Sequence, residues 1–299
     1  YTTLLAGLIS FSINTIFFIN LIVAKVIWMS NDKIKVAIVG VGNCASSFVQ
    51  GIEHYSNSDD EDGLISDVIG GYEVSDIEVV AAYDINSLKV GKDLSEAIFA
   101  EPNNTIKFCD VPKTGVTVQP GVINDGVGKF VKDIINTSPD SDNFEDSLIE
   151  SGAEILINLL PVGSEKAVKY YAQAAINSNV GFINCIPVFI ARDEEWYKKF
   201  KDAAVPLIGD DIKSQVGATI VHRALAQLFS DRGVKLENTY QLNVGGNMDF
   251  LNMLEEDRLE TKRTSKTSSV TSVANKGTGI SADNVRIGPS DYVKWLEDR

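Results

Sequence analysis

The stretch KIKVAIVGVGNCAS, residues 33–46, decides the fold of this chain. A β-branched run at residues 34–39 predicts a short buried strand. The strand ends in the turn GVGNCA, residues 40–45, which passes into a helix-capable segment at residues 46–55. A strand, a glycine turn and a helix in this order are typical of the dinucleotide-binding fingerprint in its alanine-ending form.

The small residues of this turn each meet a physical requirement. Gly40 permits the tight turn, and Gly42 lets a pyrophosphate approach the backbone. Ala45 is small enough for the helix to pack closely against the strand. The N–H groups and positive dipole end of the helix then face the phosphates, which makes Asn43 and Cys44 candidate cofactor contacts as well.

An acidic residue supports the same interpretation. Residues 77–83 predict a second strand that ends in Asp84, where a carboxylate can accept hydrogen bonds from an adenosine ribose and so favours NAD over its 2′-phosphorylated relative. Asp84 arrives about twenty residues later than usual, because an acidic insert at residues 56–62 and a Gly70-Gly71 turn precede it. The alternative is a tight strand-to-helix turn with no ligand.

Bulk composition narrows the class of protein. The chain has 299 residues, 44% of them apolar, and a net charge of −14, which argues against a nucleic-acid partner. Three well-separated cysteines and only two histidines, His54 and His222, offer no zinc cluster and indicate a reduced, cytoplasmic protein. Each histidine is more readily explained as a satisfied structural residue than as a catalyst.

Residues 1–28 do not match the rest of the chain. Residues 4–28 are almost wholly apolar, with Lys25 their only charge, and are long enough to span a bilayer. They could be a membrane anchor, an uncleaved signal, or upstream sequence that is not part of the natural protein. Met29 resembles a start site directly before the first strand, so we favour the last interpretation, expect no membrane association, and leave the segment out of the fold prediction.

Strands alternate with helices over residues 29–208, which predicts an α/β Rossmann-type domain with a doubly wound parallel sheet. Further strands are expected at residues 155–159, 180–184 and 205–208. Helices are expected at residues 86–100, 130–136, 143–151, 164–177, where Ser164 is the cap, and 193–202.

The motif GDDIKS, residues 209–214, begins a second, smaller α+β domain over residues 209–299. A strand, this polar turn and a long helix at residues 217–231 suit a second anion site, where a phosphate could be held by Ser214, Gly217 and Thr219. The alternative is ordinary capping of the helix by Asp211 or Ser214.

A strand at residues 240–245 leads into an amide-rich turn that carries Asn243, Asn247 and Asp249. The next predicted helix, residues 251–264, continues toward Lys266, and Lys262 and Lys266 share one face if it persists. The alternative for these cations is a solvated basic patch made of Arg258, Lys262 and Arg263. Beyond Lys266, the Ser/Thr-rich run to residue 278 is expected to form a strand and an exposed loop.

Six motifs together resemble one known family, myo-inositol-1-phosphate synthase, also called inositol-3-phosphate synthase, in its shorter prokaryotic form. The resemblance covers residues 33–299, and the motifs are VAIVGVGNCAS (36–46), LPVGS (160–164), GDDIKS (209–214), LNVGGNMDFLN (242–252), SKT (265–267) and IGPSD (287–291).

The resemblance implies an NAD-dependent isomerase that converts D-glucose 6-phosphate into 1D-myo-inositol 3-phosphate. The route is oxidation at C5, enolisation, aldol cyclisation and re-reduction. The second domain would be catalytic and would build a homotetramer through its strands.

The resemblance also implies roles for individual residues. The catalytic set is Asp211, Asn243, Asp249, Lys262 and Lys266. Cofactor contacts are Gly40, Gly42, Asn43, Cys44, Ala45, Asp84, Pro161 and Asp210. Substrate contacts are Lys213, Ser214, Gly217, Thr219 and Asn247.

The family continues beyond Arg299, with a further active-site lysine directly after the Asp298-Arg299 dipeptide. The resemblance therefore implies a C-terminally truncated chain that binds NAD without full turnover. Two other functions stay open at this point: an ordinary NAD-dependent dehydrogenase of a small polar substrate, and a non-enzymatic nucleotide-binding module.

Overall fold

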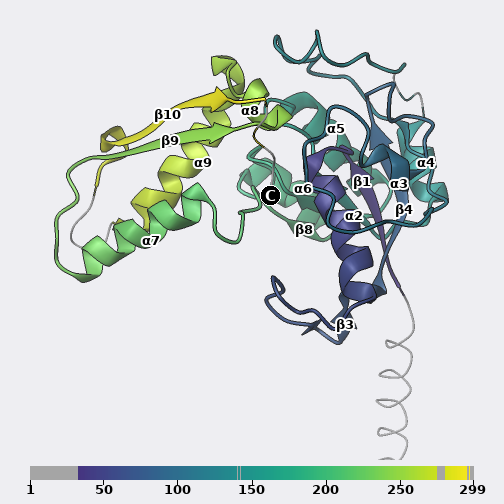
Figure 1. Ribbon diagram of the computed structural model, residues 1–299, viewed down its shortest axis with the longest axis horizontal. Coiled ribbons are helices and arrows are strands. Elements are labelled where there is room, and N and C mark those ends of the chain that lie inside the picture. Colours follow the sequence, from purple (N-terminus) through teal and green to yellow (C-terminus); the bar gives the residue numbers. More distant parts are fainter. Residues whose placement is uncertain (1–32, 140, 142, 275–279, 295, 297–299) are drawn as a thin grey trace, which may run out of the picture.

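The computed structural model describes residues 33–139, 141, 143–274, 280–294 and 296, so the prediction for residues 1–28 lies outside the described part. A six-stranded parallel sheet forms the larger region, with the strand order β5-β4-β1-β6-β7-β8 (Figure 1). Its strands are β1 (Ile34–Val39), β4 (Ile77–Asp84), β5 (Gln119–Pro120), β6 (Ile155–Asn158), β7 (Gly181–Asn184) and β8 (Leu207–Ile208). Because the chain leaves β1 first toward β4 and later toward β6, the order reverses beside β1, and the predicted doubly wound fold is confirmed.

Helices cover both faces of this sheet, which explains its continuous apolar strands. Ala37 and Val39 of β1 face a core built with α4 (Phe144–Glu150), α5 (Glu165–Asn177) and α6 (Glu194–Asp202). Ile38, one residue out of phase, faces the opposite core, built with α2 (Asn43–Ser56) and α3 (Leu94–Ala97).

Two predicted helices of this region are wrong. Residues 86–100 form turns followed only by the four-residue α3, because Asp93 caps that helix and also accepts hydrogen bonds from the backbone of Thr114 and Gly115. Residues 130–136 form turns instead of a helix. In the first case the side-chain bonds of Asp93 replace helical ones.

The insert before β4 contains a small hairpin. Strands β2 (Val68–Ile69) and β3 (Tyr72–Glu73) pair antiparallel, and the 3-10 turn η1 (Val74–Asp76) follows them. Gly70 and Gly71 have φ of 65° and 91°, the left-handed values that a two-residue hairpin turn requires, so the predicted turn is confirmed.

The remaining elements form an elongated arm beside the six-stranded sheet (Figure 1). They are α7 (Ala218–Asp231), β9 (Thr239–Gly245), α8 (Met248–Asn252), α9 (Glu256–Ala274), the turn η2 (Ala282–Asn284) and β10 (Val285–Tyr292). Strands β9 and β10 pair parallel, and α7 and α9 pack together along them. The predicted division into residues 29–208 and 209–299 stays a prediction.

The strand predicted directly after Lys266 is wrong, because α9 continues to Ala274, and the end of the predicted loop, residues 275–278, lies outside the described part. Two serines beyond Lys266 are satisfied within the helix: the hydroxyls of Ser268 and Ser269 both donate to the carbonyl of Ser265. Val270 is buried in the core of the arm, which gives this polar segment one anchored face. The single helix predicted at residues 251–264 is in fact split between α8 and α9.

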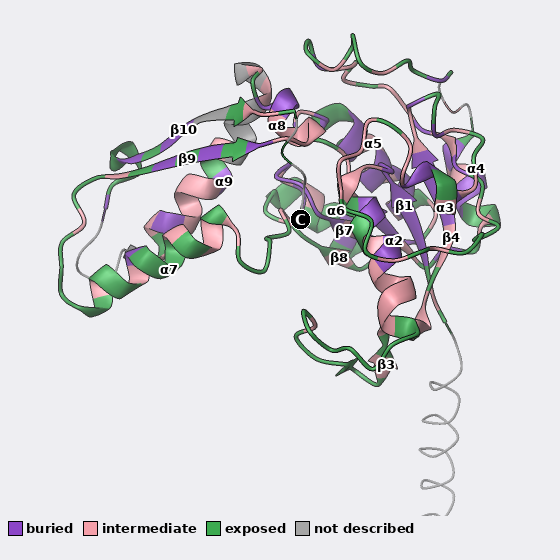
Figure 2. Cartoon of the chain, in the orientation of Figure 1, coloured by how far each residue is buried: buried purple, intermediate pink, exposed green. Residues whose placement is uncertain are grey.

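Strand β9 has an inverted pattern of burial. Its inward positions Gln241 and Asn243 are polar and buried, whereas Tyr240, Leu242 and Val244 are exposed by 63%, 65% and 54% (Figure 2). A two-layer unit usually buries its apolar face. The inner face of β9 is therefore polar, and its outer face is an apolar surface that the described residues leave exposed.

Within the described residues, no helix combines the length and apolar character needed to span a membrane.

Candidate active site

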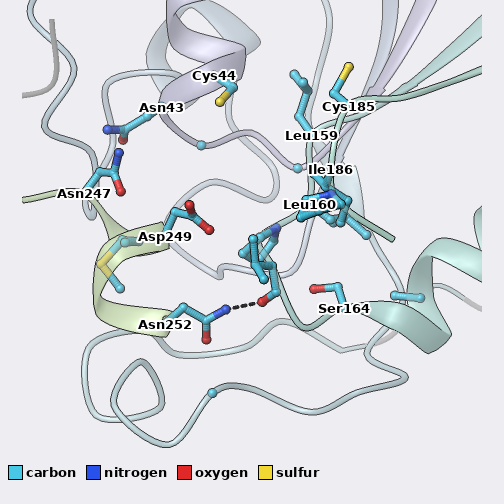
Figure 3. A pocket seen from close by; sticks show the side chains of 18 of the residues that line it. Asn43, Cys44, Leu159, Leu160, Ser164, Cys185, Ile186, Asn247, Asp249 and Asn252 are labelled. Carbon is cyan, nitrogen blue, oxygen red and sulfur yellow. Dashed lines mark hydrogen bonds between the residues drawn. The ribbon is translucent and has the colours of Figure 1, made fainter. Parts of the chain in front are cut away.

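A cavity of about 900 Å³ lies where the carboxyl ends of the six-stranded sheet meet the arm. This size suits a ligand pocket, and the place is the one where doubly wound sheets bind ligands. The predicted site residues that line it are Gly40, Gly42, Asn43, Cys44, Asp84, Pro161, Asp211, Lys213, Ser214, Gly217, Thr219, Asn243, Asn247, Asp249 and Lys266. Residues more than 200 positions apart, such as Asn43 and Asn252, thus share one cavity (Figure 3).

The glycine turn has the geometry that its sequence predicts. Gly40 has φ of 91°, and a Cβ there would lie 2.8 Å from the carbonyl oxygen of Leu159, so only glycine fits. A Cβ on Gly42 would meet no described atom within 4 Å and would enter the cavity. Gly42 is also the N-cap of α2, with no side-chain cap from the described residues and no acidic residue in the first turn. Ala45 is fully buried beneath the turn, where it packs instead of lining the cavity.

Asp84 and a buried lysine hold this turn together. Asp84 Oδ2 accepts a hydrogen bond of 2.7 Å from Val41 N, and Oδ1 accepts one of 2.8 Å from Asn86 N. Lys89 Nζ donates to the carbonyl of Val41. Burial lowers the pKa of Lys89, while the charges of Asp84 and Glu101 act in the opposite direction. The sequence analysis missed Lys89, which also lines the cavity.

The loop of the LPVGS motif reaches the cavity through Pro161. Ser164 is the N-cap of α5, as predicted, but its side chain forms no cap with the described residues. Asp125 supplies the cap instead, since its carboxylate accepts bonds of 2.9 and 2.8 Å from Lys166 N and Ala167 N.

The two aspartates of the GDDIKS motif point in different directions. The carboxylate of Asp210 accepts bonds from the side chain of Asn184 and from the backbone N–H groups of residues 190–192. A cofactor contact of Asp210 stays a prediction, because these bonds give it a structural role. Asp211, which lines the cavity, has φ of 67°, and its carboxylate contacts Lys213 Nζ and Ser265 Oγ. Ser265 is a buried partner that the sequence analysis missed.

Helix α7 presents a second open N-terminus. Gly217 is its N-cap, and the described residues provide neither a side-chain cap nor an acidic first turn. The capping alternative for Asp211 and Ser214 is therefore wrong. Ser214, Gly217 and Thr219 line the cavity around this N-terminus, which suits an anion.

The arm contributes the remaining polar groups through β9, α8 and α9. Asn247 Oδ1 caps α8 with a bond of 3.1 Å from Phe250 N. Figure 3 shows Asn247 and Asn43 pointing toward one another, and Asp249 pointing into the cavity. Lys266 lines the cavity from α9. The same helix carries Lys262, as predicted, but the side chain of Lys262 lies outside the part that the structure describes.

Arg258 connects the arm to the six-stranded region. Its guanidinium donates to the carbonyls of Gly163 (3.4 Å) and Asp125 (3.2 Å), and its Nε lies 3.3 Å from Glu255 Oε2. The solvated-patch alternative is therefore wrong for Arg258, whose side chain is only 14% exposed. Asn252 adds a bond from its side-chain nitrogen to the carbonyl of Val162 (Figure 3).

An α/β architecture whose ligand-sized cavity is shared by two regions suits an enzyme, and comparisons with known proteins show the family. The family model described as myo-inositol-1-phosphate synthase matches residues 217–299. An inositol-3-phosphate synthase of Mycolicibacterium smegmatis is 57% identical over 277 residues, which are 89% of this chain and 75% of that protein. The corresponding protein of Corynebacterium glutamicum is 53% identical over 278 residues, 91% of this chain and 77% of its own length.

A crystal structure of a myo-inositol-1-phosphate synthase-related protein from Thermotoga maritima matches with a TM-score of 0.71 at 24% identity, covering 89% of this chain and 75% of that one. This likeness supports the fold. The sequence matches go further: the chain belongs to the inositol-3-phosphate synthase family, and the family resemblance drawn from its motifs is confirmed.

Proposed function

We propose that this protein is an NAD-dependent isomerase that converts D-glucose 6-phosphate into 1D-myo-inositol 3-phosphate. One observation carries the proposal: a single cavity is lined by the glycine turn of α2 and by the second open helix N-terminus of α7. Two anion sites in one cavity suit a dinucleotide beside a sugar phosphate.

The residues around the glycine turn fit NAD. Gly42 leaves space where a side chain would meet the pyrophosphate, and the N-terminus of α2, whose N-cap is Gly42, supplies a positive dipole end. Asp84 has lone pairs left for a ribose, because each of its oxygens accepts one hydrogen bond from a backbone N–H group. Its charge disfavours a 2′-phosphate.

When bound, NAD⁺ accepts a hydride from the sugar and returns it within the same turnover. The chain's own groups stabilise the negative charge that develops on sugar oxygens during oxidation, enolisation and ring closure. Lys266 and Asn243 line the cavity and can act as cationic and amide donors, with Lys262 proposed as a second ammonium. Asp249 and Asp211 can accept hydrogen bonds from hydroxyls, so that the two ends of the sugar are brought together.

Ser214, Gly217 and Thr219 would hold the phosphate at the start of α7, with Lys213 close by. Lys213 contacts Asp211 and lies 3.3 Å from Ser265 Oγ, which fixes it at this edge of the cavity. The phosphate would thereby anchor the substrate away from the reacting carbons.

A homotetramer in the cytoplasm is part of the same proposal. The outer face of β9 exposes Tyr240, Leu242 and Val244 in a row, which is an apolar surface that a second copy of the chain could cover. No nucleic-acid partner is proposed, since the net charge is −14.

The test is an assay of the purified full-length enzyme with glucose 6-phosphate and NAD⁺. We expect inositol phosphate to form while absorbance of NADH stays flat, because the cofactor is regenerated. Accumulation of NADH would instead favour an ordinary dehydrogenase. Calorimetric binding of NAD⁺ without binding of glucose 6-phosphate would favour the non-enzymatic nucleotide-binding module.

A further inference from the structure

Three polar side chains form a chain of hydrogen bonds that ends at the cavity. His222 Nδ1 of α7 lies 3.0 Å from Gln241 Oε1 of β9, and Gln241 Nε2 lies 2.8 Å from Asn243 Oδ1. Gln241 and Asn243 are 8% and 7% exposed. Of the three, Asn243 lines the cavity.

This series of hydrogen bonds has a direction, because a side-chain amide donates at one end and accepts at the other. His222 donates from Nδ1 to the oxygen of Gln241, while its Nε2 lies 2.6 Å from the hydroxyl of Thr239, which can either donate or accept. Gln241 is therefore held with its nitrogen toward Asn243. The oxygen of Asn243 is occupied by that nitrogen, and the Nδ2 end of the amide is the one left for the cavity.

We propose that His222 and Gln241 are positioning residues that hold Asn243 with its N–H group, and not its carbonyl oxygen, toward the oxygens of the bound sugar. The inference rests on the proposed function, in which those oxygens become negatively charged. A fixed N–H donor stabilises such a charge, whereas a carbonyl oxygen at the same place repels it. Orientation thus matters as much as the presence of the amide.

The decisive variants differ in how they change the direction of the hydrogen bonds between His222, Gln241 and Asn243. Gln241→Glu keeps the shape but leaves only acceptors, so Asn243 must turn its nitrogen toward the new carboxylate. Gln241→Met removes both bonds and leaves Asn243 free to present either end. We expect the Glu variant to lose about a hundredfold in kcat and the Met variant less than about tenfold, with NAD⁺ affinity and Tm measured alongside.

Asn243→Ala provides the matched background. Without an amide to turn round, Gln241→Glu should cost little beyond Asn243→Ala alone, so the two losses are strongly non-additive. If the Glu side chain acts only through its charge or through poor packing, the losses multiply. Multiplying losses, or a Met variant as impaired as the Glu variant, would overturn the proposal.

Substrate binding keeps this test separate from the proposed function. If the wild type forms no inositol phosphate, the proposed function fails. The orientation of Asn243 by His222 and Gln241 is then tested by calorimetry with glucose 6-phosphate in the presence of NAD⁺. Gln241→Glu should weaken substrate binding about tenfold through the loss of one donor, and Gln241→Met should not. Equal affinities of the two variants for glucose 6-phosphate would overturn the proposal.

Discussion

The six-stranded sheet and the sheet of β9 and β10 bury their side chains in opposite ways. In the six-stranded sheet, Ala37 and Ile38 point to opposite faces and both are fully buried, because helices of the same chain cover each face. In β9 the inward residues Gln241 and Asn243 are polar, and the outward residue Leu242 is 65% exposed. Helices of the described chain thus cover both faces of the first sheet at β1, whereas β9 of the second turns polar side chains inward, of which Asn243 lines the cavity, and apolar side chains outward.

The two regions therefore have different roles: the larger sheet stabilises the fold, and the arm supplies polar groups to the cavity. Cores on both faces of the larger sheet hold the carboxyl ends of its strands in place, and the glycine turn with them. The arm places its amides and Lys266 opposite that turn, and Arg258 connects the two through the carbonyls of Gly163 and Asp125. Substitutions in the two regions should therefore have different consequences.

The largest expected effect lies in the arm. Replacing Lys266 or Lys262 with Met should lower the rate of inositol phosphate formation about a hundredfold or more, because an ammonium that stabilises oxyanions is lost. NAD⁺ affinity should stay almost unchanged, since the cofactor turn belongs to the other region. Lys235→Met, at a lysine whose side chain is 75% exposed, is the control. Near-normal turnover in both active-site variants would show that the pair is only a solvated face.

In the six-stranded region, two glycines of one turn should behave differently. Gly40→Ala places a Cβ 2.8 Å from the Leu159 carbonyl oxygen at φ of 91°, so both Tm and NAD⁺ affinity should fall. Gly42→Ala meets no described atom within 4 Å, so its Tm should hold while NAD⁺ affinity falls about tenfold or more. Gly91→Ala is the control for backbone strain alone, because Gly91 has φ of 85° and a Cβ there would meet no described atom within 4 Å. Equal losses of Tm for Gly40→Ala and Gly42→Ala would contradict this account.

A smaller effect is expected at the ribose end. The wild type should bind NAD⁺ about tenfold or more tightly than NADP⁺, because Asp84 repels a 2′-phosphate. Asp84→Asn keeps an oxygen that can accept from Val41 N but removes the charge, so the ratio should move toward one. Fluorescence titration with NAD⁺ and NADP⁺ measures this ratio of affinities. Equal affinities in the wild type would show that Asp84 does not contact the ribose.

The smallest effect is a change in mass. Leu242→Lys on the outer face of β9 should dissociate the proposed tetramer, lowering the molar mass by about twofold to fourfold, with the fold retained. Ile149→Lys is the matched control, since Ile149 is exposed by 57% on α4 of the other region. Light scattering after size exclusion gives the masses, and an unchanged mass for Leu242→Lys would place any interface elsewhere.

Much of the larger region was predictable because its signals are local. The apolar run of β1, the glycines after it and Asp84 at the end of β4 can each be recognised from a few neighbouring residues. The helix at residues 86–100 was mispredicted because Asp93 bonds to Thr114 and Gly115, some twenty positions away, which no local pattern reveals. Likewise, Val270 anchors the end of α9 through tertiary burial, against a Ser/Thr-rich sequence.

The candidate site divides in the same way. Residues in short motifs, such as Ser214 or Asn247, were predicted and do line the cavity. Lys89 and Ser265 were missed because their importance depends on folding: one reaches the carbonyl of Val41, 48 positions away, and the other contacts Asp211, 54 positions away. A lone lysine carries no such signal in sequence, and the SKT motif that contains Ser265 does not reveal which side chain its hydroxyl contacts. Gln241 was passed over for the same reason, since its role depends on the neighbours at its two ends.

The central claim is that the two regions close one cavity in which a hydride leaves the sugar and returns to it. Glucose 6-phosphate carrying deuterium at C5, incubated with the full-length enzyme, NAD⁺ and an excess of unlabelled NADH, tests this most directly. Mass spectrometry of the inositol phosphate should show the deuterium retained at that carbon, because the cofactor stays bound throughout the turnover. Product without deuterium, with the label found in free NADH, would contradict the account.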